Sequence, residues 1–202
     1  MRIGLIGFTL GIGFALVAGA VAANAADSKY VGAGKCRTCH KKEMIGNQYG
    51  AWQEGPHAKA FETLKSEEAQ KIAADKGISG PANEAAECLK CHVTAYGKDA
   101  SAFATAPNKN EEGVGCESCH GPGSAYRKKK VMADHAASVA AGMWEPGKNA
   151  EVCTACHNSE SPTAKPFDHA ARVEEIAHPI PAEVKGRYIE AEKEARAKKK
   201  QQ

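Results

Sequence analysis

The pentapeptide Cys-x-x-Cys-His occurs four times in this chain and uses all eight of its cysteines. The four copies are Cys36, Cys39 and His40; Cys88, Cys91 and His92; Cys116, Cys119 and His120; and Cys153, Cys156 and His157. Two cysteines at this spacing present both thiols from one helical turn, which matches the two vinyl groups at one edge of a porphyrin. The histidine that follows is carried beneath the iron as its proximal ligand. The sequence therefore predicts four covalently attached haem c groups.

A zinc site or a disulfide framework fits the pattern less well. Zinc sites rarely place a histidine directly after the second cysteine in every repeat, and a disulfide framework requires no histidine at all. In the third copy, glycines flank the motif at 113–115 and 121–123, where they let the backbone approach a flat macrocycle. Haem attachment accounts for every cysteine and also for the histidine after each pair, which neither alternative explains.

The first 25 residues have the pattern of a secretory signal peptide. Met1-Arg2 is a positive start, residues 3–21 are apolar, and Ala23-Asn24-Ala25 has the small-x-small form of a cleavage site. We predict cleavage after Ala25, a single mature domain at 26–202 and a periplasmic location, with an extracellular one as the alternative. An uncleaved membrane anchor is the other interpretation of the apolar run. No second such run follows, so no membrane span is expected after cleavage.

The composition predicts a thin protein core, because aromatic residues make up only 6% of the chain. Four apolar porphyrins would supply the missing core. We therefore expect a mostly α fold with long irregular loops, wrapped around four haems. A helix is predicted around Phe61 and Leu64, which either continues or restarts at a cap at Ser66 and runs to 75, and another helix is predicted over 124–142. A charged helix is predicted at about 181–200.

The formal net charge of +3 does not indicate a nucleic-acid partner. Each haem adds two propionates, which outweigh this small positive charge, so no nucleic acid is expected as a partner. The basic run at 127–130 is interpreted as a solvated helix face, and a docking face for an acidic redox protein is the alternative.

Four histidines remain outside the motifs, the same number as the irons that need a sixth ligand: His57, His135, His169 and His178. His57 opens an apolar helical segment, His135 lies in the helix predicted after the third motif, and His178 precedes Pro179. These three are the stronger candidates for distal ligands, and His169 is the weakest. Methionine is another common sixth ligand, but with enough histidines present we expect none of the methionines to ligate.

The chain resembles the tetrahaem cytochrome c-554 family in several segments. They are 35–40, 57–64, 88–93 with Tyr96-Gly97, 113–123 and 167–178, and the glycine-rich 113–123 is the most specific. The resemblance implies a mostly helical wrap around closely packed haems in stacked and perpendicular pairs. It also implies an electron carrier of the kind that serves hydroxylamine oxidoreductase in ammonia oxidisers.

The same resemblance implies a set of ligand pairs. In it His135 ligates the first haem opposite His40, His178 the third opposite His120, and His57 the fourth opposite His157. The second haem of the family lacks a sixth protein ligand and is high-spin, and here it corresponds to the haem of His92. His169 departs from the family, in which we expect a carboxylate at this place. It would close the second haem, ligate a haem of a neighbouring subunit, or ligate nothing.

The main functional prediction is a tetrahaem electron carrier, not an enzyme, with no catalytic residue assigned. Electrons would hop between haems and pass from a donor to an acceptor redox protein. One alternative is reduction of a small ligand such as nitric oxide at a five-coordinate second haem. Another is a homo-oligomer, as the subunit of an extracellular conductive filament. The sequence leaves the partners, the haem potentials and the metabolic pathway open.

Overall fold

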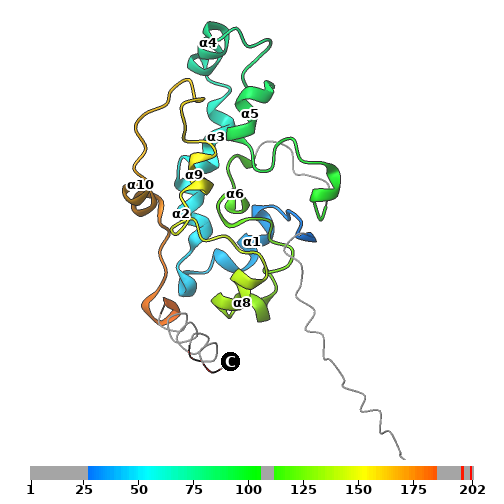
Figure 1. Cartoon of the computed structure of the whole chain (residues 1–202), viewed down its shortest axis with the longest axis vertical. Coiled ribbons are helices and arrows are strands. Elements are labelled where there is room, and N and C mark those ends of the chain that lie inside the picture. The colour runs from blue at the N-terminus through cyan, green and yellow to red at the C-terminus, as the bar shows by residue number, and fades with distance from the viewer. Residues whose placement is uncertain (1–26, 106–111, 186–196, 198–200, 202) are drawn as a thin grey trace, which may run out of the picture.

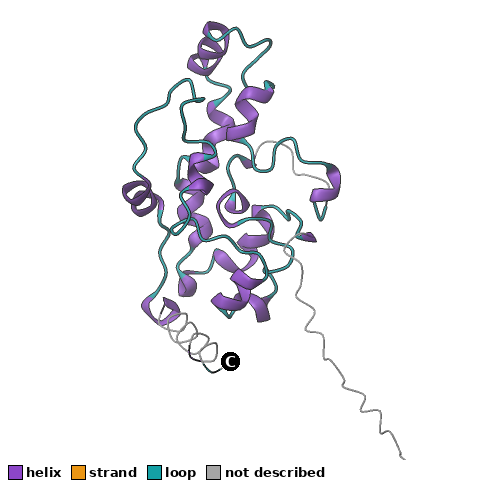
Figure 2. Cartoon of the chain, viewed as in Figure 1, coloured by secondary structure: helices purple, strands orange, loops and turns teal. Residues whose placement is uncertain are grey.

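The computed structural model describes residues 27–105, 112–185, 197 and 201. Short helices joined by loops make up this part of the chain, which contains no β-strand beyond one isolated bridge between Tyr30 and Phe103 (Figure 2). The elements in order are α1 (Ala33–His40), η2 (Glu43–Ile45), α2 (Gln48–Glu54), η3 (His57–Lys59), α3 (Ala60–Thr63), α4 (Glu67–Asp75), α5 (Ala86–His92), η4 (Ala100–Ala102), α6 (Cys116–His120), α7 (Lys129–Met132), α8 (His135–Ala140), α9 (Glu151–Thr154) and α10 (His169–Ile176). The predicted mostly α fold with irregular loops is confirmed.

A conventional apolar core is found at one end of the molecule, where α3, α4 and α5 meet (Figure 1). Its buried members are Phe61, Leu64, Ala73, Ala82 and Leu89. Phe61 and Leu64 lie on one face of the predicted helical segment, as their one-turn spacing indicates. The cluster is small, as the low aromatic content of the chain predicts.

The start of α4 follows the predicted capping pattern. The Ser66 hydroxyl accepts a hydrogen bond from the backbone N–H of Ala69 at 3.2 Å. Two glutamates, at 67 and 68, occupy the first turn, where the helix dipole favours negative charge. Gly77 follows the helix with a φ of +68°, a conformation that suits glycine. Of the two alternatives, the structure shows the restart at Ser66, with the helix ending at Asp75 as predicted.

The helix predicted over 124–142 is instead two short helices, α7 and α8. The break falls at Asp134, whose backbone is extended and whose carboxylate accepts from the N–H of Ala137 at 3.0 Å. Ser138 is buried, and its hydroxyl donates to the carbonyls of Val131 and Asp134. A side chain that caps a new helix start competes with helix continuation, which explains the difference.

The middle of the molecule holds α1, α2, α6 and α9, while α8 lies at the end opposite α4 (Figure 1). α1 packs against both α2 and α6, and α6 packs against α9. A long loop carries the chain from α9 to α10 at the side (Figure 1). The helices of the first, third and fourth motifs are thus neighbours in space although they are far apart in sequence.

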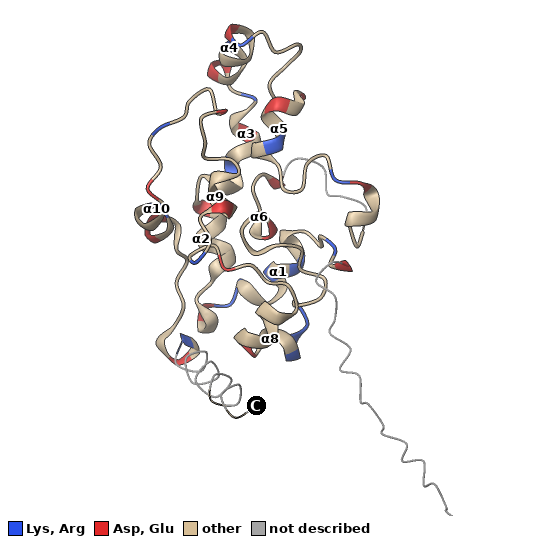
Figure 3. Cartoon of the chain, in the orientation of Figure 1, with Lys and Arg blue, Asp and Glu red and all other residues tan. Residues whose placement is uncertain are grey.

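Positive and negative side chains are interspersed over the described elements (Figure 3). The basic run at 127–130 is exposed, in and before α7. The predicted signal peptide at 1–25 lies outside the described residues. Of the predicted helix at 181–200, residues 182–185 are helical and most of the remainder is also outside them. In the described part of the chain, no helix has the length and apolarity that crossing a membrane requires.

Candidate haem-binding sites

All four motifs lie on short helices or continue from one. α1 ends at His40, α5 ends at His92, and α6 spans the whole third motif. The fourth motif begins in α9 and continues through a turn, in which the N–H of His157 still donates to the carbonyl of Cys153 at 2.9 Å. None of the eight cysteines is in a disulfide. Both thiols of each motif are therefore available on one turn of chain, as thioether attachment requires.

The thiols of different motifs meet in pairs. A side-chain hydrogen bond joins Cys36 to Cys116, which lowers the pKa of Cys36 and, with burial, raises that of Cys116. Burial and the nearby thiol of Cys91 raise the pKa of Cys156 to about 12. The first motif is thus next to the third, and the second is next to the fourth.

A third neighbour relation joins these two pairs of motifs. The third motif is also next to the fourth, because α6 packs against α9, and burial and the charge of Cys153 raise the pKa of Cys119. Burial lowers the pKa of His120, and the charge of His178 and then that of His40 add to this shift, in agreement with the closeness of the first and third motifs. The spatial order of the motifs is therefore first, third, fourth, second.

Three motif histidines place Nδ1 against an oxygen atom. The contacts are His40 with Oε1 of Gln48 (3.1 Å), His92 with the carbonyl of Ala60 (2.7 Å) and His120 with the carbonyl of Trp144 (3.3 Å). Carbonyl and amide oxygens only accept, so Nδ1 is the donor in each case. The lone pair of the neutral ring is then on Nε2, which is the arrangement of metal-ligating histidines. These residues fit the haem iron that the motifs imply.

Two pairs of histidine rings lie at the separation expected across one metal. The ring centroids of His57 and His157 are 6.1 Å apart, and those of His120 and His178 are 6.0 Å apart. With a metal–nitrogen bond of about 2 Å and about 1 Å from nitrogen to ring centre, two opposed imidazoles would be about 6 Å apart. Each pair joins a motif histidine to one of the predicted distal ligands.

The surroundings of both pairs favour neutral imidazole. Burial and the charge of His157 lower the pKa of His57. Burial lowers the pKa of His178, and its Nδ1 is a buried atom without a hydrogen-bond partner in the described structure. Phe167 stacks on His157, with 4.8 Å between ring centroids and 13° between planes. A neutral ring keeps the lone pair that a metal needs.

The other two predicted distal histidines have different neighbours. Nε2 of His135 lies 3.4 Å from Oε1 of Glu145. His169 begins α10, and its Nε2 lies 2.8 Å from the carbonyl of Pro146. Among the ring contacts found between described residues, none pairs His169 with His92. The roles suggested for His135 and His169 therefore stay predictions.

Glu117, inside the third motif, is a buried carboxylate that the sequence analysis did not identify. Its oxygens accept from the backbone N–H groups of Val31 (3.0 Å to both oxygens), Gly32 (2.7 Å) and Gly123 (2.6 Å). Burial raises its pKa and the three N–H groups oppose that shift. Glu117 thus fixes the segment before the first motif to the turn after the third. The sequence feature that could have indicated this role is an acidic residue between two glycine-rich stretches.

Gly121 and Gly123 have protein neighbours of their own. Gly121 has a φ of +73°, and a Cβ there would come within 2.7 Å of the Trp144 ring. A Cβ on Gly123 would be 3.1 Å from Oε1 of Glu117. The buried Tyr126 donates from its hydroxyl to the carbonyl of Gly121 at 2.8 Å. The glycines after the third motif therefore allow close packing of Trp144 and Glu117 against the backbone.

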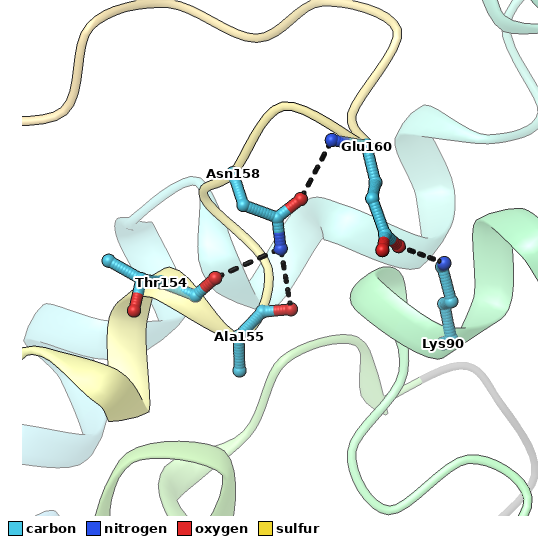
Figure 4. Close-up of polar contacts among 5 residues, drawn as sticks. All are labelled: Lys90, Thr154, Ala155, Asn158 and Glu160. Carbon is cyan, nitrogen blue, oxygen red and sulfur yellow. Dashed lines mark hydrogen bonds and ion pairs between the residues drawn. The ribbon is translucent and has the colours of Figure 1, made fainter.

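An exposed contact links the second motif to the loop after the fourth (Figure 4). Nζ of Lys90 lies 2.7 Å from Oε2 of Glu160, and the pairing raises the pKa of Lys90 and lowers that of Glu160. Asn158 accepts from the N–H of Glu160 and donates to the carbonyls of Thr154 and Ala155. Asn158 thereby closes the end of α9 and sets the loop that carries Glu160.

Comparison with known proteins gives one consistent result. The family model for cytochrome c554 and c-prime matches residues 35–121. Cytochrome c-554 of Nitrosomonas europaea is 35% identical over 150 residues, which are 66% of this chain and 59% of that protein. The chain thus spans less than two thirds of that relative's length. The solved structure of reduced cytochrome c554 from Nitrosomonas europaea matches with a TM-score of 0.50 and 25% identity, over 76% of this chain and 80% of that one.

Proposed function

The chain belongs to the cytochrome c554 family and carries four covalently bound haem c groups, and we propose on this basis that it is an exported electron carrier. Electrons would pass from a donor to an acceptor redox protein by hopping between the haems. The bound haem supplies a one-electron iron couple. The protein attaches the haems through its eight motif cysteines, ligates their irons and keeps them close to one another.

The observation that carries this proposal is the pair of opposed histidine couples, His57 with His157 and His120 with His178. Imidazole on both faces fills the coordination of an iron and leaves no site for a substrate, which suits electron transfer. We assign proximal ligation to His40, His92, His120 and His157. Distal ligation is assigned to His57 for the fourth haem, His178 for the third and His135 for the first.

The contacts between motifs support a continuous path for electrons. Cys36 meets Cys116, Cys119 is near Cys153, and Cys156 meets Cys91. Haems attached to these cysteines would follow the order first, third, fourth, second. Electrons would therefore enter or leave most readily at the first and second haems, which end the series.

A second candidate function, reduction of a small ligand, rests on His92. Its Nδ1 is bound to the carbonyl of Ala60, and among the described residues no histidine ring faces it. His169, the residue suggested to close this haem, uses its Nε2 at the carbonyl of Pro146. An iron ligated by His92 alone would have one open position, at which a ligand such as nitric oxide could bind.

An EPR spectrum of the purified ferric protein, beside a His169→Ala variant, separates these functions. Three low-spin haems and one high-spin haem in both proteins support the assignment of ligands and favour small-ligand binding at the second haem. Four low-spin haems that become three in the variant make His169 the missing ligand and favour a pure carrier. Two or more high-spin haems in the native protein, or the absence of reversible reduction at an electrode, would refute the carrier.

Export is tested separately, by determining the N-terminus of the protein recovered from the periplasm. The proposed cleavage predicts a mature chain that begins at Ala26. Haem-loaded protein that retains Met1 and sediments with membranes would instead support the membrane-anchor interpretation of residues 3–21.

A further inference from the structure

Gln48, the first residue of α2, uses both ends of its side-chain amide. Its Oε1 lies 3.1 Å from Nδ1 of His40, the histidine of the first motif. Its Nε2 donates to the carbonyl of Pro179 at 3.0 Å and also contacts the carbonyl of Ile45. Pro179 is 131 positions from Gln48 in the sequence. One side chain thus joins two distant segments, each of which holds a candidate iron ligand.

The segment that Gln48 reaches carries His178, which directly precedes Pro179. The His178 ring is 6.0 Å from that of His120, in the third motif. Close approach here depends on Gly46, since a Cβ at that position would lie 2.2 Å from the carbonyl oxygen of Pro179. Gly46 also has a φ of +103°, which disfavours other residues. The turn before α2 is therefore shaped to receive the backbone beside His178.

We propose that Gln48 is a positioning residue that ties the proximal ligand of the first haem to the distal-ligand segment of the third. The proposal rests on the ligand assignment given above for His40 and His178. As an acceptor, Gln48 polarises the Nδ1–H of His40 and makes the ring a stronger electron donor, which favours the ferric state of the first haem. As a donor to Pro179, it fixes the position from which His178 reaches the third haem.

The acceptor role is tested with Gln48→Glu and Gln48→Leu in the haem-loaded protein, with Gln53→Glu and Gln53→Leu as controls. Gln53 is exposed on the same helix, so these controls reproduce the change of charge and polarity away from His40. NMR-monitored redox titration resolves the four haem potentials. We expect a negative shift of the first haem in Gln48→Glu, because carboxylate is the stronger acceptor, and a positive shift in Gln48→Leu. Shifts of the same sign, or none beyond the Gln53 controls, would overturn this role.

The donor role is tested by the spin state of the third haem. Both Gln48 variants lose the donor to Pro179, so each should gain a high-spin fraction at that haem, seen by EPR. A Cβ in Gly46→Ala would lie 2.2 Å from the carbonyl oxygen of Pro179 and 2.9 Å from Nε2 of Gln48, so this variant should displace Pro179 and its link to Gln48. It should therefore also gain a high-spin fraction at the third haem. A fully low-spin third haem in all three variants would overturn the link through Pro179.

His178→Ala examines the ligand assignment alone. A third haem that becomes high-spin in this variant supports the assignment. A third haem that remains low-spin refutes it, and with it the link from Gln48 to a distal ligand. Opposite shifts in the two Gln48 variants would then still support the role of Gln48 at His40, so the two failures can be told apart.

Discussion

Replacement of Glu117 by alanine should remove a large share of the stability of the protein. The carboxylate is 2% exposed and accepts from the N–H groups of Val31, Gly32 and Gly123. Glu117→Ala leaves these three donors without a partner. Each unsatisfied buried donor costs about 1–3 kcal/mol, so a loss of about 4 kcal/mol is expected even if water reaches one of them. The whole free energy of unfolding of a native domain is only about 5–15 kcal/mol.

The assay is equilibrium unfolding of the haem-loaded protein in guanidinium chloride, followed by Soret circular dichroism. Glu117→Gln keeps one carbonyl oxygen and should lose about 2 kcal/mol, roughly half the cost of alanine. Glu87→Ala is the control, because Glu87 is exposed on the helix of the second motif, and it should change stability by less than about 0.5 kcal/mol. A Glu117→Ala protein as stable as this control would refute the structural role given to the buried carboxylate.

Three further predictions concern single side chains. Leu89→Ala should lower the free energy of unfolding by about 2–5 kcal/mol in chemical denaturation, because Leu89 is buried in the apolar cluster. Ser66→Ala should cost about 1 kcal/mol and speed amide exchange in the first turn of α4, and unchanged exchange would contradict the cap. Burial raises the pKa of Glu117, so the folded chain holds that proton to higher pH than the unfolded chain does. The stability contributed by this bound proton should be full below about pH 4.3 and be lost as the pH rises through the folded pKa. Glu117→Gln, which does not titrate, should lack this part of the slope when the free energy of unfolding is measured against pH.

The local features of this fold were largely predictable because they depend on neighbouring residues. The motif spacing placed both thiols of each motif on one turn, Ser66 marked a helix start, and Phe61 with Leu64 marked a buried face. The break at Asp134 was missed, although an aspartate at that place is a common helix cap. The apolar pattern over 124–142 continued across the break, so periodicity alone did not locate it.

The contacts between distant segments could not be predicted from patterns among neighbouring residues. Nothing in the spacing of Gln48 indicates that its amide reaches Pro179, because this depends on how the chain returns after α10. The same holds for Glu117, whose three partners come from two separate turns. The histidine couples were implied by family resemblance and not by spacing, since any free histidine fits any open iron on sequence grounds. Only the structure shows that the ring of His57 lies near that of His157 and the ring of His178 near that of His120.

The couple of His57 and His157 has a consequence for the unfolded chain. An iron held by both rings would close a loop of about 100 residues, and a cross-link over such a loop removes about 5 kcal/mol of chain entropy from the unfolded state. If His57 ligates the fourth haem as proposed, that haem is a reversible cross-link whose strength depends on a metal–nitrogen bond. Free imidazole that displaces His57 would act on this protein as a reductant acts on a disulfide, by opening its loop while the haem stays attached.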